Sequence, residues 1–266
     1  EADKLISLKS DINALFNSPV LGYNSKDDIV YQFWANRDSH EVYYFDPKTD
    51  YAPTTAISSI SWDDPNFPNI EGFGVWAAKC NFTMGPDGKM YSRMLGGNLV
   101  RIDVENARGE NLTNGDLVGT KDGSAYGLVF DPQDENVFYF SNNDKHCIYK
   151  YDLRTKECAC WAGQEGKSGY LDGPIGQAMF NKPGQMCVDS EGNIILTDTE
   201  NHCIRKITMS TGYVSTLAGK PQNSGYVNGS AEDAQFKKPL GICIDNDDVM
   251  YIGDSENRAI RRLAVE

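Results

Sequence analysis

The 266-residue chain carries 25 Lys+Arg against 38 Asp+Glu, a formal net charge of −13 at pH 7. Such an acidic balance disfavours unspecific attraction to nucleic acid or anionic lipid and promotes solubility. No apolar run approaches the roughly 20 residues that a membrane-spanning helix needs. We therefore expect no nucleic-acid partner and no membrane-spanning segment.

The predicted elements are short strands from the beginning of the chain. The chain starts at Glu1 and not at Met, so we expect it to be part of a longer protein. A first strand is predicted at residues 4–9, and β-branched and aromatic runs at 29–34 and 41–45 belong to a first repeat unit near 20–57. Strand patterns resume at 82–88, 90–92 and 99–103, and again at 126–131.

The C-terminal half contains a plain internal repeat. Identical residues recur at a constant spacing of 56 residues, namely Ala162 and Ala218, Phe180 and Phe236, Asp189 and Asp245, and Asp198 and Asp254. Each unit holds four short β-rich runs separated by turn residues, as at 185–189, 193–198, 202–207 and 213–217. The sequence shows no 3.6-residue apolar stripe, which excludes a helical solenoid.

Four antiparallel strands per unit, repeated in tandem, describe the blades of a β-propeller. First strands are predicted to start near residues 18, 80, 125, 184 and 240. The last unit stops after its third strand. Either residues 4–9 supply its fourth strand, or they end a further blade whose earlier strands precede this sequence.

The strongest unit resembles a known repeat. The run Lys-Pro-x-Gly-Ile-x-x-Asp, followed by Tyr-Ile-x-Asp-x-x-Asn-x-x-Ile-Arg over residues 238–261, resembles the NHL repeat. The connection over 162–180 is similar to those of bacterial cell-envelope NHL proteins, in which an IPT/TIG domain often precedes the propeller. The resemblance implies an all-β, NHL-type β-propeller, with residues 1–266 forming one domain. It also implies six blades as the norm, and an extracytoplasmic place at the cell surface or in the periplasm.

The candidate polar site lies at the ends of the second strands. In an up-and-down blade, the turn after the second strand emerges on the same face as the connections between blades, where binding is expected. The residues at these positions are Asn36, Asn142, Asp198 and Asp254. They are either a polar ring at the mouth of a central channel, or caps that accept backbone N–H bonds across their turns.

The three histidines are interpreted as structural. His40, His146 and His202 each stand four residues after one of these polar positions, and a residue repeated in every blade typically bonds a neighbouring loop. The sequence contains no convincing nucleophile–base pair. We therefore assign no catalytic residue, no metal site and no cofactor.

Two tryptophans are the candidate binding anchors. Residues 58–80 fit no repeat and place Trp62 and Trp76 among carboxylates and amides. Aromatic rings beside such groups suit the stacking of sugar rings or the docking of a peptide. The alternative is a long loop that packs its aromatic side chains onto the propeller.

The seven cysteines form no tight framework, so we expect buried free thiols, including Cys158 and Cys160, which share one strand face. The predicted function is a non-enzymatic binding propeller of a bacterial surface protein, acting as a monomer. Its partner is a small ligand, a glycan or a protein. The alternatives are a metal-dependent hydrolase or lyase of the lactonase or amidating-lyase type, which the resemblance implies, and a structural scaffold.

Overall fold

The computed structural model describes residues 20–24, 29–36, 39–45, 53–57, 61–63, 83–93, 98–113 and 127–264. The chain divides into two compact units: Glu1–Met94 with Val100–Asn111, and Leu95–Leu99 with Leu112–Glu266. Strands dominate both units. No helix in the described ranges is long and apolar enough to cross a membrane.

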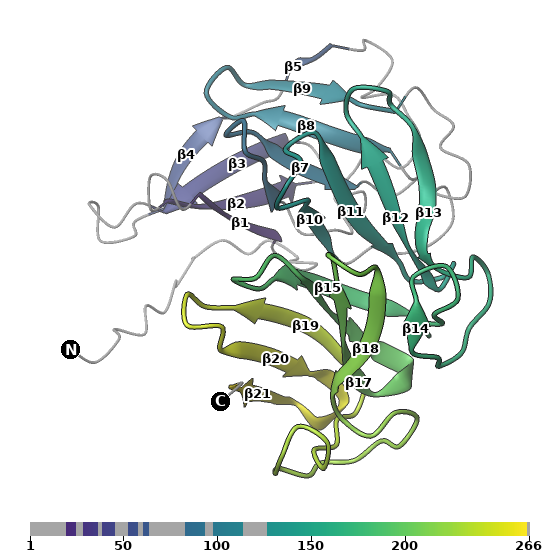
Figure 1. Ribbon diagram of the computed structural model, residues 1–266. Helices are drawn as coiled ribbons and strands as arrows, with labels where there is room; N and C mark the ends of the chain where they lie inside the picture. The colour runs from purple at the N-terminus through teal and green to yellow at the C-terminus, as the bar shows by residue number, and fades with distance from the viewer. Residues whose placement is uncertain are drawn as a thin grey trace. The chain divides into compact units, whose positions relative to one another are not determined.

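The first unit holds two sheets (Figure 1). One has the order β1 (Val20–Asn24), β2 (Ile29–Asn36), β3 (Ser39–Phe45) and β4 (Pro53–Ile57). The other consists of β6 (Thr83–Met84), β7 (Met90–Arg93), β8 (Leu99–Asp103) and β9 (Arg108–Asn111), with β5 (Ser61–Trp62) at its outer edge. Strand β5 runs parallel to β9, which the sequence did not predict.

The second unit holds three sheets. The first consists of β10 (Leu128–Phe130), β11 (Val137–Asn142), β12 (Cys147–Asp152) and β13 (Cys158–Gly163). The next consists of β15 (Pro183–Val188), β16 (Ile194–Asp198), β17 (Cys203–Thr208) and β18 (Tyr213–Ala218), with β14 (Gly173–Pro174) paired to the outer edge of β18. The last contains β19 (Pro239–Ile244), β20 (Met250–Asp254) and β21 (Ala259–Leu263). The short 3₁₀ helices η3 (Thr199–Asn201) and η4 (Ser255–Asn257) follow β16 and β20.

Each sheet is an up-and-down blade, because its repeat strands, four in the first four sheets and three in the described part of the last, pair antiparallel and lie side by side in chain order. The first strands begin at Val20, Thr83, Leu128, Pro183 and Pro239, so the five predicted starts are confirmed to within three residues. The predicted equivalence of Asp189 and Asp245 is also confirmed. Their carboxylates accept the backbone N–H of Asn193 and Val249 in the same turn, at 2.7 and 2.9 Å.

The strand register corrects one predicted equivalence. In three sheets the pairing of the third and fourth strands shifts at one bulge, where the fourth strand has an extra residue opposite the step that follows Val42, Ile148 and Ile204. Aligned on this bulge, the residue level with Asp198 is Trp34, and Asn36 lies two residues further along β2. The paired part of the β2–β3 hairpin therefore extends two residues further than that of the β16–β17 hairpin, and its turn is shorter. Asn36 is therefore not at the repeat position of Asp198, as predicted from spacing along the chain, whereas His40 keeps the position of His202, two residues before the shift in the third strand.

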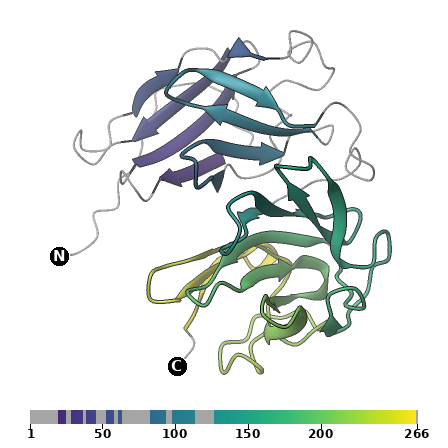
Figure 2. The same ribbon diagram turned by 45° about the horizontal axis from the view of Figure 1, so that its top comes forward.

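Apolar cores lie between successive sheets of the second unit. One packs residues of β10–β13 against residues of β15–β18, and the next packs β15–β18 against β19–β21, which lie side by side in Figures 1 and 2. Ile148 and Ile204 occupy one repeat position and have no exposed surface, because the following sheet covers them. Ile260, at the same position in the last sheet, is 79% exposed.

Candidate functional site

Two buried ion pairs between aspartate and arginine support the inter-blade loops, and the first of them contains Asp198 at the end of β16. Its carboxylate accepts the backbone N–H of Asn181 at 2.7 Å, Nδ2 of Asn201 at 2.8 Å and Nη1 of Arg205 at 2.7 Å. Neither Asp198 nor Arg205 has exposed surface. A buried ion pair is tolerated when further hydrogen bonds satisfy both partners. The bonds from Asn181 and Asn201 meet that condition for the Asp198 carboxylate.

Arg205 uses Nη1 and Nη2 to hold the connection between two sheets, residues 164–182, called here the first inter-blade loop, while its buried Nε has no hydrogen-bond partner among the described residues. Its guanidinium donates to the carbonyl oxygens of Leu171 and Met179 at 3.0 and 3.1 Å, and to the Asp172 carboxylate at 2.6 Å. The guanidinium carbon also lies 4.9 Å from the ring centre of Tyr170 and 5.1 Å from that of Phe180. One arginine therefore fixes both arms of the loop.

The next repeat reproduces this arrangement around Asp254 and Arg261. Asp254 accepts the N–H of Lys237 at 2.7 Å, Nδ2 of Asn257 at 2.8 Å and Nη1 of Arg261 at 2.9 Å. Arg261 in turn donates to the carbonyl oxygens of Val227 and Gln235, in the second inter-blade loop, residues 219–238. Its guanidinium carbon lies 5.0 and 5.1 Å from the rings of Tyr226 and Phe236.

The protonation of this cluster follows from its burial. Removal from water raises the pKa of Asp198 to about 6, while the charge of Arg205 and the hydrogen bonds from Arg205, Asn201 and Asn181 oppose that rise. At pH 7 the carboxylate is therefore mainly ionised and pairs with the guanidinium.

The sheet of β10–β13 replaces the charged pair by a neutral one. Asn142 stands where Asp198 does, and Tyr149 stands where Arg205 does, so both charges are absent together. Asn142 has no exposed surface, and its side-chain oxygen accepts the N–H of Lys145 at 3.1 Å. Tyr149 is buried as well.

One histidine accepts a hydrogen bond from the C-terminal end of each inter-blade loop. Nδ1 of His146 accepts the backbone N–H of Lys182 at 3.1 Å, and Nδ1 of His202 accepts that of Lys238 at 3.2 Å. Both lysines have a positive φ, 56° and 50°. The predicted structural role is confirmed for these two histidines. Burial lowers the pKa of His146, with the charge of Lys182 as the next cause.

Comparison with known proteins now identifies the repeat. Residues 180–207 match the family model of the NHL repeat. The fold is that of an NHL-type β-propeller. Over 94% of its length the chain is 25% identical to SUPPRESSOR OF QUENCHING 1, chloroplastic, of Arabidopsis thaliana, of which the match covers 25%.

Solved structures agree on the propeller fold. A Bacteroides thetaiotaomicron protein of unknown function superposes with a TM-score of 0.77 at 24% identity, covering 92% of this chain and 58% of that one. An auxiliary nutrient binding protein from the same organism gives 0.70 at 23%, with the same coverage. A virginiamycin B lyase from Staphylococcus aureus gives 0.54 at 15%, covering 93% and 70%. The chain thus spans a quarter of the plant relative and 58% of the Bacteroides structures.

Of the predicted polar ring, Asp198 and Asp254 each hold an inter-blade loop, whereas Asn142 caps its own turn. Asn142, Asp198 and Asp254 have no exposed surface, so their side chains do not meet a ligand directly in this conformation. Asn36 lies at the end of β2, where only the backbone is described. The sequence reading missed Arg205 and Arg261, although both recur at the 56-residue spacing, because a buried arginine is not expected from composition.

Of the two tryptophans predicted as anchors, the structure describes only the backbone of Trp62. The backbone of Trp62 belongs to β5 and pairs with Gly109 at the outer edge of its sheet. Next to it, Asp63 forms an ion pair with Arg108, and the Asp63 N–H donates to the carbonyl oxygen of Gly109 at 3.0 Å. Trp76 lies outside the described residues. The anchor role of both tryptophans stays a prediction.

The NHL inter-blade loops present apolar side chains to solvent at matching positions. Leu171 is 46% exposed and Val227 is 43% exposed, and each pairs through its backbone with the other arm of its own loop. Tyr226 is 61% exposed. The equivalent Tyr170 is less exposed because its hydroxyl bonds the hydroxyl of Thr216 on β18, at 2.8 Å.

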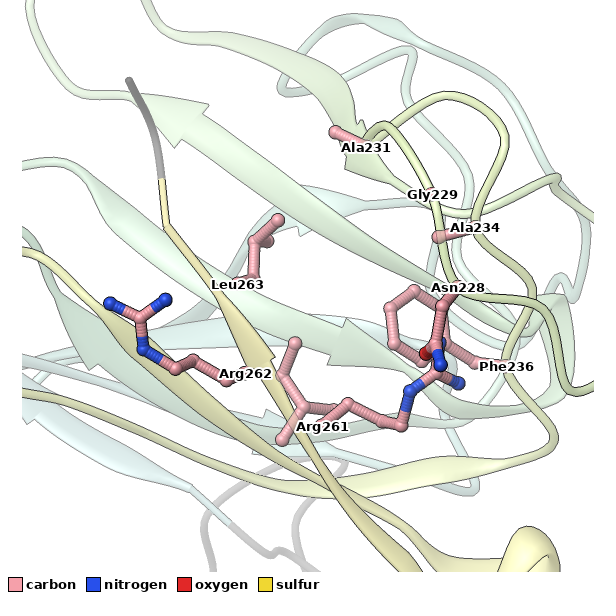
Figure 3. A pocket seen from close by; sticks show the side chains of 9 residues that line it. Asn228, Gly229, Ala231, Ala234, Phe236, Arg261, Arg262 and Leu263 are labelled. Carbon is pink, nitrogen blue, oxygen red and sulfur yellow. The ribbon is translucent and has the colours of Figure 1, made fainter.

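A hollow of about 200 Å³ lies beside β21 (Figure 3). Ala231, Ala234, Phe236 and Leu263 line it, together with Asn228 and Arg261, whose polar ends meet at one side. In the preceding repeat, Val214 of β18 pairs with Ile207 and Gly173, the counterparts of Leu263 and Gly229. The hollow therefore occupies the place of a fourth strand.

The described part of the chain contains no group of three or more His, Cys, Asp or Glu side chains that could hold a metal ion. The six cysteines of the same part are free thiols as predicted, but of these only Cys147 and Cys203 are buried: Cys158, Cys160 and Cys187 are partly exposed and Cys243 is exposed.

Proposed function

We propose that this NHL propeller is a non-enzymatic binding module that recognises a small ligand, a glycan or a protein through its inter-blade loops. The observation that carries the proposal is the repeated pairing of a rigid loop with an exposed apolar residue. Leu171 and Val227 remain nearly half exposed, while a buried arginine holds the carbonyl group of each in place. Binding to a pre-ordered surface loses little conformational entropy.

The Bacteroides structures support binding as the general activity. Two proteins of this fold, from Bacteroides thetaiotaomicron and Bacteroides ovatus, are auxiliary nutrient binding proteins, with TM-scores of 0.70 and 0.71. At 23% and 22% identity they share the fold with this chain. The extracytoplasmic location in this proposal follows from the resemblance to envelope NHL proteins, and the glycan ligand follows from the aromatic residues beside carboxylates and amides in residues 58–80.

Three aromatic residues are the proposed anchors. Trp62 and Trp76 come from the non-repeating segment, and Tyr226 joins them because it is exposed and one ring face stacks on Arg261. An aromatic ring held by a buried cation offers its other face to a sugar ring or an apolar side chain.

A glycan and peptide array would find the ligand, and calorimetric titration of single alanine variants would map it. Truncating a true anchor is expected to weaken binding by about 2 kcal/mol or more. Tyr213→Ala is the matched control, because Tyr213 is a tyrosine that is 46% exposed at the end of β18 away from the second inter-blade loop. Parental affinity in the Trp62→Ala, Trp76→Ala and Tyr226→Ala proteins would contradict the anchor role of these three residues.

The enzyme alternative rests on fold likeness alone. The virginiamycin B lyase shares the propeller at 15% identity, and that level of similarity transfers no catalytic residue. Turnover of a lactone or peptidyl substrate by the purified chain would replace the binding proposal.

A further inference from the structure

Two cysteines approach each other at the base of the first inter-blade loop. Cys147 begins β12 and Cys160 lies on the neighbouring β13. Cys147 pairs with Gly163 across the strands, and Cys160 pairs with Tyr149, so the bulge makes the two cysteines diagonal neighbours.

The side-chain geometry brings the sulfur of Cys160 toward Cys147. Its Sγ lies 3.7 Å from the carbonyl oxygen of Gly163. Gly163 in turn is so close to Cys147 that a Cβ added to it would be 3.2 Å from the Cys147 Cα. Hydrogen bonding between the two thiols is the first cause that raises the pKa of Cys147 and lowers that of Cys160. Cysteines that are diagonal neighbours on one face of adjacent strands can be joined by a disulfide when a small backbone movement brings their sulfurs to bonding distance.

The repeat itself does not require the second thiol. In the following sheet, Cys203 takes the position of Cys147, but Thr216 takes that of Cys160. The Thr216 hydroxyl bonds Tyr170, and its N–H donates to Asp172 at 3.1 Å. Packing of the blade is thus achieved with one cysteine, and the thiol pair is particular to the sheet of β10–β13.

We propose that Cys147 and Cys160 form a reversible disulfide that closes the base of the first inter-blade loop. The oxidant is a low-molecular-weight disulfide such as glutathione disulfide. The Cys160 thiolate attacks one sulfur of that disulfide, and a glutathione thiolate leaves. Cys147 then loses its proton and attacks the Cys160 sulfur, which releases the second glutathione. Two protein thiols are oxidised and one external disulfide is reduced to two thiols.

The order of the two steps follows from exposure. Cys160 is half-buried and reachable from solvent, whereas Cys147 has no exposed surface. Hydrogen bonding from the Cys147 thiol lowers the pKa of Cys160, which favours the thiolate that attacks first. The fully buried Cys147 acts second, on a sulfur already beside it.

The test uses the full chain in glutathione buffers of rising oxidised fraction, with acid quench, alkylation by N-ethylmaleimide and tryptic peptide mapping. Lys150, Arg154 and Lys156 separate the two cysteines, so trypsin places them in different peptides that only a disulfide joins. We expect the alkylated forms of Cys147 and Cys160 to disappear together, and a linked peptide about 2 Da lighter than the sum of its parts to appear. Dithiothreitol should reverse the change.

The matched variants are Cys160→Ser, in which Cys147 should stay a free thiol at every ratio, and Cys158→Ser, which should keep the linked peptide. Thermal unfolding of each variant in reducing buffer checks that it is folded. A Cys158–Cys160 link, a stable glutathione adduct on Cys160, or full alkylation of both thiols at every ratio would overturn the proposal.

Discussion

A left-handed backbone position explains the role of His146. The residue has a φ of 56°, and this conformation turns its imidazole toward the backbone of Lys182. Nδ1 accepts a hydrogen bond there, so it has to be unprotonated. The equivalent His202 has a φ of 58° and the same contact with Lys238. The repeat thus uses histidine as a neutral acceptor.

This role predicts a pH dependence of stability. Because burial lowers the pKa of His146 below the usual 6.5, the unfolded chain takes up the proton first as the pH falls. The stabilising contribution is complete above about pH 6.5 and is lost as the pH falls through the folded-state pKa. We expect His146→Asn, whose side-chain oxygen accepts the same N–H and whose residue type tolerates positive φ, to lose less stability between pH 7.5 and 5.5 than the parent.

Urea unfolding midpoints at the two pH values measure this difference. Equal pH dependence in both proteins would show that the His146 imidazole does not titrate differently in the folded state.

The inter-blade loop is an element fixed by one side chain rather than by its own hydrogen bonds alone. Arg205 reaches both arms of the first loop, and Arg261 does the same for the second. Gly163, with a φ of 94°, begins the first loop where any Cβ would come within 2.9 Å of the Phe180 ring. The loops therefore hold a defined shape without regular secondary structure beyond β14.

Replacing Arg205 should lower the free energy of unfolding, because the buried Asp198 carboxylate loses its counter-ion. Arg205→Tyr leaves Asp198 without its cation, and breaking such a pair typically costs about 3–5 kcal/mol of unfolding free energy. The double change Asp198→Asn with Arg205→Tyr copies the neutral pair of Asn142 and Tyr149, so we expect it to be more stable than Arg205→Tyr alone. Arg262→Tyr, at an exposed position, is the control.

Chemical denaturation of the three variants gives these free energies. If Arg205→Tyr and the double variant unfold at the same denaturant concentration, the charge of Asp198 is not what makes the arginine necessary.

At the scale of the whole molecule, the last sheet is incomplete within the described residues. It has three strands, a hollow where β18 lies in the preceding repeat, and Ile260 exposed where Ile204 is buried. Unpaired edges and uncovered apolar faces are sites of association that native proteins normally cover. From the sequence, residues 4–9 either supply the fourth strand or end a further blade, and they lie outside the described residues.

Deleting residues 1–12 tests that prediction. If residues 4–9 complete the last sheet, the truncated protein should unfold at a lower temperature than the full chain, because an edge and an apolar face become exposed. Differential scanning calorimetry compares the two, and removal of residues 265–266 provides a terminal-trimming control. An unchanged melting temperature for the shorter chain would mean that residues 4–9 do not close this sheet.

The sequence by itself determined the blade. Period-2 strands, turn residues and the recurrence of Phe180 and Asp198 after 56 residues are local or repeated signals, and they predicted the five sheets. Tertiary structure decided the site. Whether Asp198 faces a ligand or a buried arginine depends on where residues far along the chain meet, and the position of Asn36 depended on a bulge that spacing does not reveal. Burial and strand register arise from long-range packing, which one sequence records only indirectly.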